Sequence, residues 1–285
     1  MDLRRLTLLH ELSRLGSMRA VADELGYTTS TVSQQLSVLA REAGTALIEP
    51  TGRRVRLTPA GERLAAHAGT ILAAVDAARA DLDPSGEPAG TVRVAGFATA
   101  IRRSLLPVVA RLSAEHPAVH LRLYEHEPAE AVQLLADDEV DLALVYDYEL
   151  APVRWDPLFA ITPLWTSAWD LGVPAADATQ ALAAFADADW IVNSRNVADE
   201  HVVRLLASLA GFEPRIAHRA DSLELVQDLI VGGFGVGLLP AEMPLREGIG
   251  RLPLRDPGVH LRAYLAVRRG RENWPPLRLI SSMLV

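Results

Sequence analysis

The stretch from Ala20 to Leu36 restricts the fold of this chain more than any other part of the sequence. Two apolar stripes at helical spacing lie in and around it, the first formed by Met18, Val21, Ala22 and Leu25 and the second by Val32, Leu36 and Leu39. Gly26 stands between the stripes, where a left-handed residue commonly ends a helix. The spacing predicts two short helices joined by a tight turn, an arrangement that suits a second helix entering the major groove of DNA.

The side of the second helix opposite its apolar stripe carries small hydrogen-bonding residues. Hydroxyl groups can reach phosphates, and a glutamine can bond to an adenine edge with two hydrogen bonds. The residues that we expect to contact DNA from this helix are Thr29, Ser30, Thr31, Ser33, Gln34, Ser37 and Arg41. This pattern alone leaves open an ordinary helical hairpin whose polar face is solvated.

The residues after this helix predict a β-hairpin that carries arginines. Thr51-Gly52-Arg53-Arg54 reads as a basic turn, and Val55-Arg56-Leu57 alternates like a short strand. We expect Arg53 and Arg54 to contact DNA. Residues 1–60 hold eight arginines against six acids, whereas the remainder holds 20 arginines against 30 acids. The first 60 residues thus have the charge that a DNA-binding module needs, although the whole chain carries −8.

Residues 20–64 resemble the winged helix-turn-helix of LysR-type transcriptional regulators. The shared features are the alanine-rich first helix, the triplet Ser33-Gln34-Gln35, Gly44 and the closing sequence Leu57-Thr58-Pro59-Ala60-Gly61. The chain departs from the family pattern at Thr29, at Ala40 and at Pro50, which follows Glu49. These departures affect one phosphate contact and the base preference, so the operator sequence does not follow from relatives.

Residues 60–84 predict a linker helix suited to dimerisation. Its apolar positions step by four and three residues in a heptad seam, formed by Leu64, Ala68, Ile71, Val75, Ala78 and Leu82. The alternative is a helix packed only on its own domain. Against this, the Pro- and Gly-containing segment 83–90 that follows offers no core. Helix-turn-helix proteins also commonly meet two half-sites as two-fold dimers.

Residues 91–285 alternate between strand and helix patterns in two blocks. Such alternation predicts parallel sheets with helices on both faces, and two blocks predict two subdomains with a cleft between them. We place the first subdomain at about 91–160 and 268–285 and the second at about 161–267. The resemblance to LysR-type regulators implies the same fold class: a winged helix-turn-helix at 1–59, the linker helix, and an α/β effector domain of two Rossmann-like subdomains, similar to type II periplasmic binding proteins.

The carboxyl ends of the strands predict the place of a ligand cleft. Unpaired N–H groups at helix N-termini favour an anion, so we expect a small effector that is a carboxylate or another anion. The candidate effector-binding residues are Ala98, Thr99, Ala100, Tyr146, Asn193, Ser194 and Arg195. Taken singly, each of these residues also suits an ordinary capping position.

Several kinds of chemistry are not expected in this chain. It contains no cysteine, which excludes disulfides and thiolate metal sites. Glu125-His126-Glu127 and Asp137-Asp138-Glu139 lack a recognised ligand spacing, and we expect both to be solvated edges. We therefore predict no metal, no cofactor and no catalytic residues. A signal peptide and a membrane span are not expected either, which predicts a cytoplasmic protein.

The leading hypothesis is a transcriptional regulator, not an enzyme. A homodimer or homotetramer would bind an interrupted inverted repeat of double-stranded DNA, sense a small molecule and act on RNA polymerase. The alternative is an α/β solute-binding or enzymatic protein with an accessory helical domain. A third hypothesis is a constitutive repressor or architectural protein whose cleft is vestigial.

Overall fold

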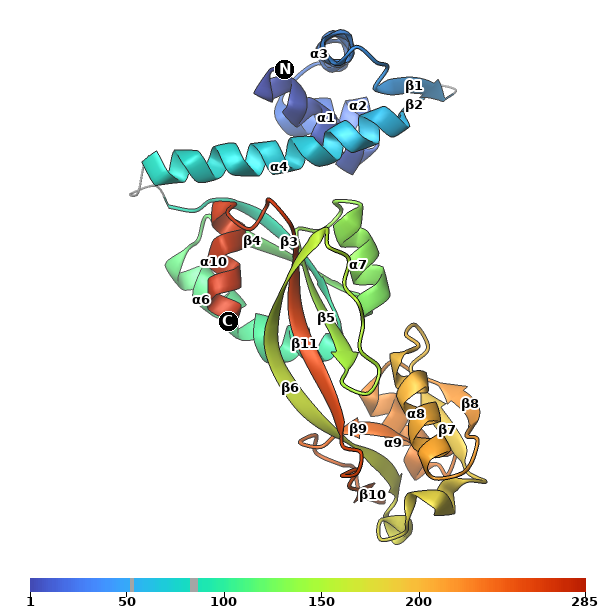
Figure 1. Ribbon diagram of the computed structural model, residues 1–285. Coiled ribbons are helices and arrows are strands. Elements are labelled where there is room, and N and C mark those ends of the chain that lie inside the picture. The colour runs from blue at the N-terminus through green and yellow to red at the C-terminus, as the bar shows by residue number, and fades with distance from the viewer. Residues whose placement is uncertain (52–53, 83–86) are drawn as a thin grey trace.

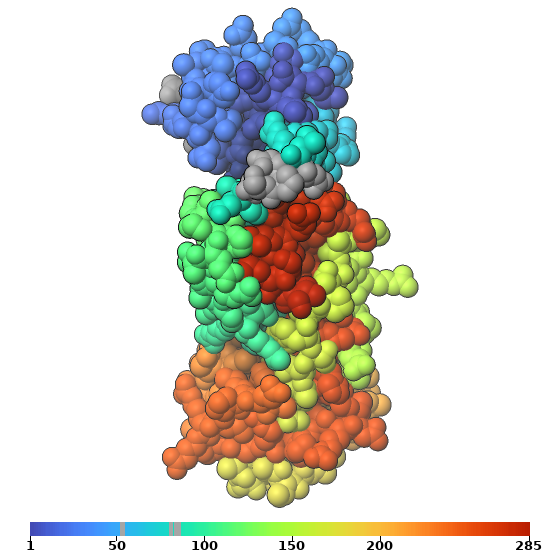
Figure 2. Space-filling view, turned by 90° about the vertical axis from the view of Figure 1, so that its left-hand side faces the viewer, coloured from blue at the N-terminus to red at the C-terminus, as the bar shows by residue number. Residues whose placement is uncertain are grey.

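The computed structural model describes residues 1–51, 54–82 and 87–285 and stacks three parts along one axis (Figures 1 and 2). An N-terminal unit lies at one end, a long helix crosses beneath it, and an α/β domain makes up the remainder. The N-terminal elements are α1 (Leu3–Leu15), α2 (Met18–Leu25), α3 (Thr29–Ala43), β1 (Ile48–Thr51) and β2 (Arg54–Leu57).

The core of the N-terminal unit uses both of the predicted apolar stripes. Val21, Val32 and Leu36 are fully buried and pack with Leu9 of α1. Gly26 ends α2 at φ 69°, a left-handed conformation that costs a glycine little. Strands β1 and β2 pair antiparallel as a wing. The predicted winged helix-turn-helix is therefore confirmed.

The wing is joined directly to α4 (Pro59–Leu82). The geometry of this junction explains why the sequence that closes the wing contains Thr58 and Gly61. The Thr58 hydroxyl donates to the carbonyl of Ala46 and accepts from the N–H of Gly61, which caps the first turn of α4. A Cβ added at Gly61 would lie only 2.0 Å from the carbonyl oxygen of Leu47. Glycine thus allows α4 to lie directly against the backbone that enters the wing.

A nine-stranded sheet runs through the whole α/β domain (Figure 1). Its main path has the order β4-β3-β5-β11-β6-β9-β7-β8, and β10 pairs with β6 outside this path. The strands are β3 (Gly90–Gly96), β4 (Val119–Glu125), β5 (Leu142–Tyr148), β6 (Phe159–Pro174), β7 (Asp189–Val192), β8 (Arg215–Arg219), β9 (Val236–Pro240), β10 (Ile249–Leu252) and β11 (Val259–Arg268).

The two subdomains share strands instead of having separate sheets. As predicted, β3 pairs parallel with β4 and β5, and β7 pairs parallel with β8 and β9. The central strands β6 and β11 are antiparallel to each other and to their outer neighbours, which the expectation of purely parallel sheets missed. Both pass from one subdomain into the other. The long β6 was not predicted, because Pro163 and the polar Thr166 and Ser167 interrupt its apolar pattern.

Helices pack on this sheet in both subdomains (Figure 1). One helical segment after β3 changes from α-helix to a π-helical turn at Ile101–Leu105 and back. Pro107 follows that turn, and because proline has no N–H it weakens the regular α-helical ladder there. The helices are α5 (Ala98–Ala100), α6 (Leu106–Glu115), α7 (Pro128–Ala136), α8 (Ala198–Leu209), α9 (Leu223–Val231) and α10 (Pro275–Leu284). Within the described ranges, no helix is both long and apolar enough to span a membrane.

Candidate DNA-binding and effector sites

Helix α3 exposes most of the side chains that were predicted to contact DNA. Thr29, Ser30, Gln34, Ser37 and Arg41 are exposed, while Thr31 and Ser33 are half-buried. Thr28 caps the start of the helix, because its hydroxyl accepts from the N–H of Thr31 at 3.2 Å. The Ser37 hydroxyl donates to the carbonyl of Ser33 and so keeps only acceptor capacity for a partner. The exposed face is continuous and lies opposite the buried stripe.

The two glutamines of the Ser33-Gln34-Gln35 triplet have different surroundings. Gln35 is half-buried and accepts a hydrogen bond from Arg5 of α1 at 3.1 Å. Arg5 also forms an ion pair with Glu42 near the end of α3. Gln34 is exposed and faces away from this contact. Gln35 therefore fixes α3 on α1, and Gln34 is the glutamine available to a ligand.

The wing places one arginine beside an acid. Arg56 lies opposite Glu49 in the strand register, and the two side chains form an ion pair. Glu49 precedes Pro50, one of the positions at which the chain departs from the family pattern. Arg53 and the side chain of Arg54 lie outside the described residues, so their predicted DNA contacts stay predictions.

A cavity of about 320 Å³ lies at the carboxyl ends of the strands, between the two subdomains. Four residues predicted to bind an effector line it, namely Ala98, Thr99, Tyr146 and Asn193. Ala100 is fully buried behind the cavity wall. Ser194 and Arg195 lie at the rim, where both bond to Asp221.

Acidic side chains in this cavity were not predicted. Glu127, Asp199 and Asp221 line it together with Trp169. Glu127 is only 7% exposed, so the expected solvated edge at Glu125-His126-Glu127 is wrong at its third residue. Its backbone turns inward at the start of α7, and its carboxylate accepts a hydrogen bond from the hydroxyl of Tyr146 at 3.0 Å. Spacing could not reveal this, because the acids come from segments far apart in the chain.

Two family models together match nearly all of the chain. Residues 3–62 match the bacterial regulatory helix-turn-helix protein, lysR family, and residues 85–285 match the LysR substrate binding domain. The chain belongs to the LysR family of transcriptional regulators. Its members combine a DNA-binding domain with an effector-binding domain, which are the two parts described above.

Relatives and solved structures agree with this assignment. The transcriptional dual regulator GltC of Bacillus subtilis (strain 168) is 26% identical and covers 96% of this chain and 93% of its own length. A probable hydrogen peroxide-inducible genes activator of Mycobacterium avium is 29% identical over 88% of this chain and 84% of its own. Full-length OxyR C199D from Pseudomonas aeruginosa superposes over 100% of this chain and 93% of its own, with a TM-score of 0.74 and 20% identity. ArgP from Mycobacterium tuberculosis superposes over 100% of this chain and 96% of its own, with a TM-score of 0.73 and 21% identity.

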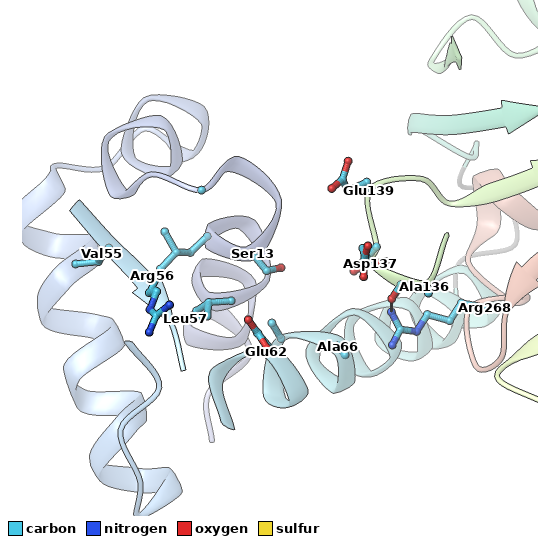
Figure 3. Close-up of a pocket in the computed structure, with 14 residues that line it drawn as sticks. Ser13, Val55, Arg56, Leu57, Glu62, Ala66, Ala136, Asp137, Glu139 and Arg268 are labelled. Carbon is cyan, nitrogen blue, oxygen red and sulfur yellow. Dashed lines mark hydrogen bonds between the residues drawn. The ribbon is translucent and has the colours of Figure 1, made fainter. Parts of the chain in front are cut away.

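In this LysR-type chain, the DNA-binding unit also touches the effector domain. A hollow of about 410 Å³ has walls from both parts. Figure 3 shows the side chains that line it. Arg56 and Leu57 of the wing and Glu62 of α4 line one side. Asp137 and Arg268 of the effector domain line the other. Movement of the effector domain would therefore change the surroundings of the wing.

A buried cluster of charges joins the two parts beside this hollow. Arg271 contacts the carboxylate of Asp138 and lies 3.5 Å from that of Asp141. Arg93 bonds to both carboxylate oxygens of Asp141. His10 of α1 reaches this cluster, with its Nδ1 3.2 Å from Asp138 and its Nε2 3.3 Å from Arg271. The DNA-binding unit thus contributes one residue to an ion cluster of the effector domain.

One sequence expectation is corrected by this cluster. Asp138 is 5% exposed, so the expected solvated edge at Asp137-Asp138-Glu139 is wrong at its central residue, while its neighbours are exposed. Asp138 adopts φ 64°, and its buried carboxylate is compensated by Arg271. The partners of His10 are more than 120 residues away along the chain, so sequence spacing does not reveal them. Burial, followed by the nearby charge of Arg271, lowers the pKa of His10 from 6.5 to about 4, so it is neutral at pH 7.

Proposed function

We propose that this chain is a dimeric, effector-responsive repressor or activator that reads an interrupted inverted repeat with α3 and the wing. The observation that carries the proposal is the continuous exposed face of α3, centred on Gln34, opposite a fully buried stripe. A helix of this kind can place Gln34 and Arg41 against base edges while the hydroxyls meet phosphates. The candidate contacts are Thr29, Ser30, Thr31, Ser33, Gln34, Ser37 and Arg41 from α3, with Arg53 and Arg54 from the wing.

The exposed part of α4 supports a dimer. Leu64 and Ala68 of its heptad seam pack on the core of their own N-terminal unit, as the simpler alternative expected. Further along the seam, Ile71 is 40% exposed and Leu82 is 87% exposed. A second copy of α4 would cover these apolar side chains. Two copies are also what two half-sites require.

The cavity between the subdomains offers a place for the effector of a regulator. An effector there would contact both subdomains. It could change the spacing between the two DNA-binding units of a dimer only if it bound one arrangement of the subunits more tightly than another. We propose that the chain works in the cytoplasm on chromosomal DNA, contacts RNA polymerase when it activates, and catalyses no reaction. Substrate turnover by the purified chain would contradict this part of the proposal.

We expect Gln34→Ala to weaken binding to the selected operator by about 1–3 kcal/mol, because the two hydrogen bonds to one base would be lost. Binding to random DNA should change little. The measurement is a gel-shift titration on an operator selected from a random library and on a scrambled sequence. Gln180→Ala is the matched control, because Gln180 is exposed and lies far from α3. Equal losses on both DNAs would show that Gln34 reads no base.

Arg53→Ala and Arg54→Ala should each weaken binding to operator and scrambled DNA alike. Each should also reduce the slope of log K against log salt by about one, because one phosphate contact would disappear. The measurement is fluorescence anisotropy between low and high salt. Arg111→Ala, on α6 of the effector domain, removes the same charge away from the DNA-binding unit. An unchanged slope in the wing variants would contradict phosphate contact.

A further inference from the structure

The cavity between the subdomains has an acidic lining. Five carboxylates line it, those of Glu125, Glu127, Asp199, Asp221 and Glu224. Arg102 is the sole cation among the described lining residues, and it already bonds to Glu224 at 3.1 Å. A small anion in this cavity would meet an excess of negative charge. The lining therefore disfavours the carboxylate that helix N-termini alone led us to expect.

Two of these carboxylates are not in an ion pair with any cation that the structure describes, although the charge of Arg195 acts on Glu127 from a greater distance. Arg195 at the rim bonds to Asp221, and Arg102 bonds to Glu224. Glu127 and Asp199 form no ion pair within 4.0 Å with any residue that the structure describes. Among the described residues, Glu127 bonds to neutral partners, which are Tyr146, Asn196 and a backbone N–H in the first turn of α7. The Oδ1 atom of Asp199 is buried and faces the buried hydroxyl of Tyr148, and neither atom has a partner in good hydrogen-bond geometry among the described residues.

Unpaired carboxylates in such surroundings are costly for the free protein. A buried charge normally needs an opposite charge and hydrogen bonds to offset its lost hydration. Burial raises the pKa of Asp199 to about 7 and also raises that of Glu127. A bound cation would favour the charged form of both groups. A cation in the cavity would therefore offset a cost that the free protein otherwise avoids only by protonating these groups.

Aromatic rings complete the wall around these carboxylates. Phe97, Tyr146 and Trp169 line the cavity, and the rings of Phe97 and Tyr146 meet edge to face at 4.7 Å between centroids. Aromatic faces attract organic cations, whereas they offer little to a free metal ion that needs several oxygen ligands. An adjoining hollow of about 370 Å³ is lined by the apolar Trp165, Leu223 and Met243 and also by Arg102 and Arg103. The Arg103 guanidinium lies 4.5 Å from the centroid of the Trp165 ring, so the apolar side chains still open to a ligand are mainly Leu223 and Met243. The cavity and the adjoining hollow together suit an amine with an apolar carbon skeleton.

We propose that the effector is a small organic cation whose ammonium group lies between Glu127 and Asp199. Its apolar part extends toward Leu223 and Met243. This inference rests on the proposed function, because it names the class of effector that the regulator would sense. It differs from that function in being testable without DNA.

The test uses ligands that have similar carbon skeletons and differ in the charge of the head group. Phenethylamine, 2-phenylethanol and 3-phenylpropanoate carry a cationic, a neutral and an anionic head, and 1,4-diaminobutane and succinate form a second set. Thermal unfolding of the full chain is followed by tryptophan fluorescence at pH 7.5. An amine present at about 100 times its Kd should raise Tm by roughly 5 °C or more, and the neutral and anionic members should not. Stabilisation by the anions, or by neither class, would overturn the proposal.

Variants give a second test that needs no ligand. Glu127→Gln and Asp199→Asn remove one carboxylate each and keep the side-chain shape. Both should raise Tm of the free protein at pH 7.5 and should weaken amine binding at least about tenfold. Glu213→Gln removes a carboxylate that is 90% exposed and lies outside the cavity, and it should change neither quantity. If Tm of the ligand-free protein fell in both cavity variants, the proposal of an unfilled cation site would be contradicted.

Failure of this proposal can be told apart from failure of the proposed function. Operator binding is measured on the same preparations by gel shift. If the amines fail while operator binding stays specific, only the effector class is wrong. If operator binding itself is absent, the regulator is wrong, whereas amine binding would still be judged by the thermal measurement alone.

Discussion

Replacing Arg271 with alanine should lower the free energy of unfolding of the effector domain by about 3–5 kcal/mol. Arg271 is 6% exposed, and its guanidinium is the main partner of the buried Asp138 carboxylate. Without it, Asp138 would keep a largely buried charge that no guanidinium contacts directly. The measurement is urea unfolding at pH 7, followed by tryptophan fluorescence.

A double-mutant cycle separates this effect from lost packing. In an Asp138→Asn background the buried charge is gone, so Arg271→Ala should cost only about 1–3 kcal/mol for the unsatisfied polar groups. Arg278→Ala on α10 is the matched control, because Arg278 is exposed. Equal losses in both backgrounds would mean that Arg271 acts by packing and not by compensating Asp138.

The second large effect is a pH dependence that comes from Asp199. Burial raises the pKa of this carboxyl to about 7 in the folded protein, against 3.8 for an exposed aspartate. Its contribution to stability is therefore fully present below about pH 4 and is lost as the pH rises through 7. The difference of about three pKa units corresponds to a loss on the order of 4 kcal/mol. The charged or titratable groups that face Asp199 are Tyr148, Glu127 and Asp221.

The difference in free energy of unfolding between the natural chain and a variant separates the pH dependence of Asp199 from that of His10. Because the pKa of His10 is lowered to about 4, its contribution is present above 6.5 and is lost as the pH falls through 4, the opposite direction. Free energies of unfolding are measured from pH 5 to 8 for the natural chain and for Asp199→Asn. The natural chain should lose stability relative to the variant as the pH rises. A constant difference across this range would show that Asp199 does not titrate there.

The N-terminal unit could be predicted in detail because its information is local. Helical spacing identified the buried Val21, Val32 and Leu36, and Gly26 marked the turn between the helices. The same periodicity placed Gln34 on the outside. It could not distinguish the roles of Gln34 and Gln35, because Arg5, which holds Gln35, comes from another helix.

The effector domain was predicted less completely. Alternation gave the parallel outer strands and most helices, but it missed β6, whose pairing with β11 is a contact between distant segments. Strand ends led to Tyr146 and Asn193 at the cavity. The same reasoning missed Asp199 and Glu127, since a carboxylate near a helix start is usually a solvated cap.

The sequence by itself determined the winged helix-turn-helix, the family and the place of the cavity, because periodicity, turn residues and motifs act over a few neighbouring residues. Only the tertiary structure decided which charges are buried and which lie together. His10, Asp138 and Arg271 form one cluster, and Glu127 and Asp199 line one cavity, although both groups are scattered along the chain. The cost of a buried charge depends on its surroundings in space, and spacing along the chain carries no record of them.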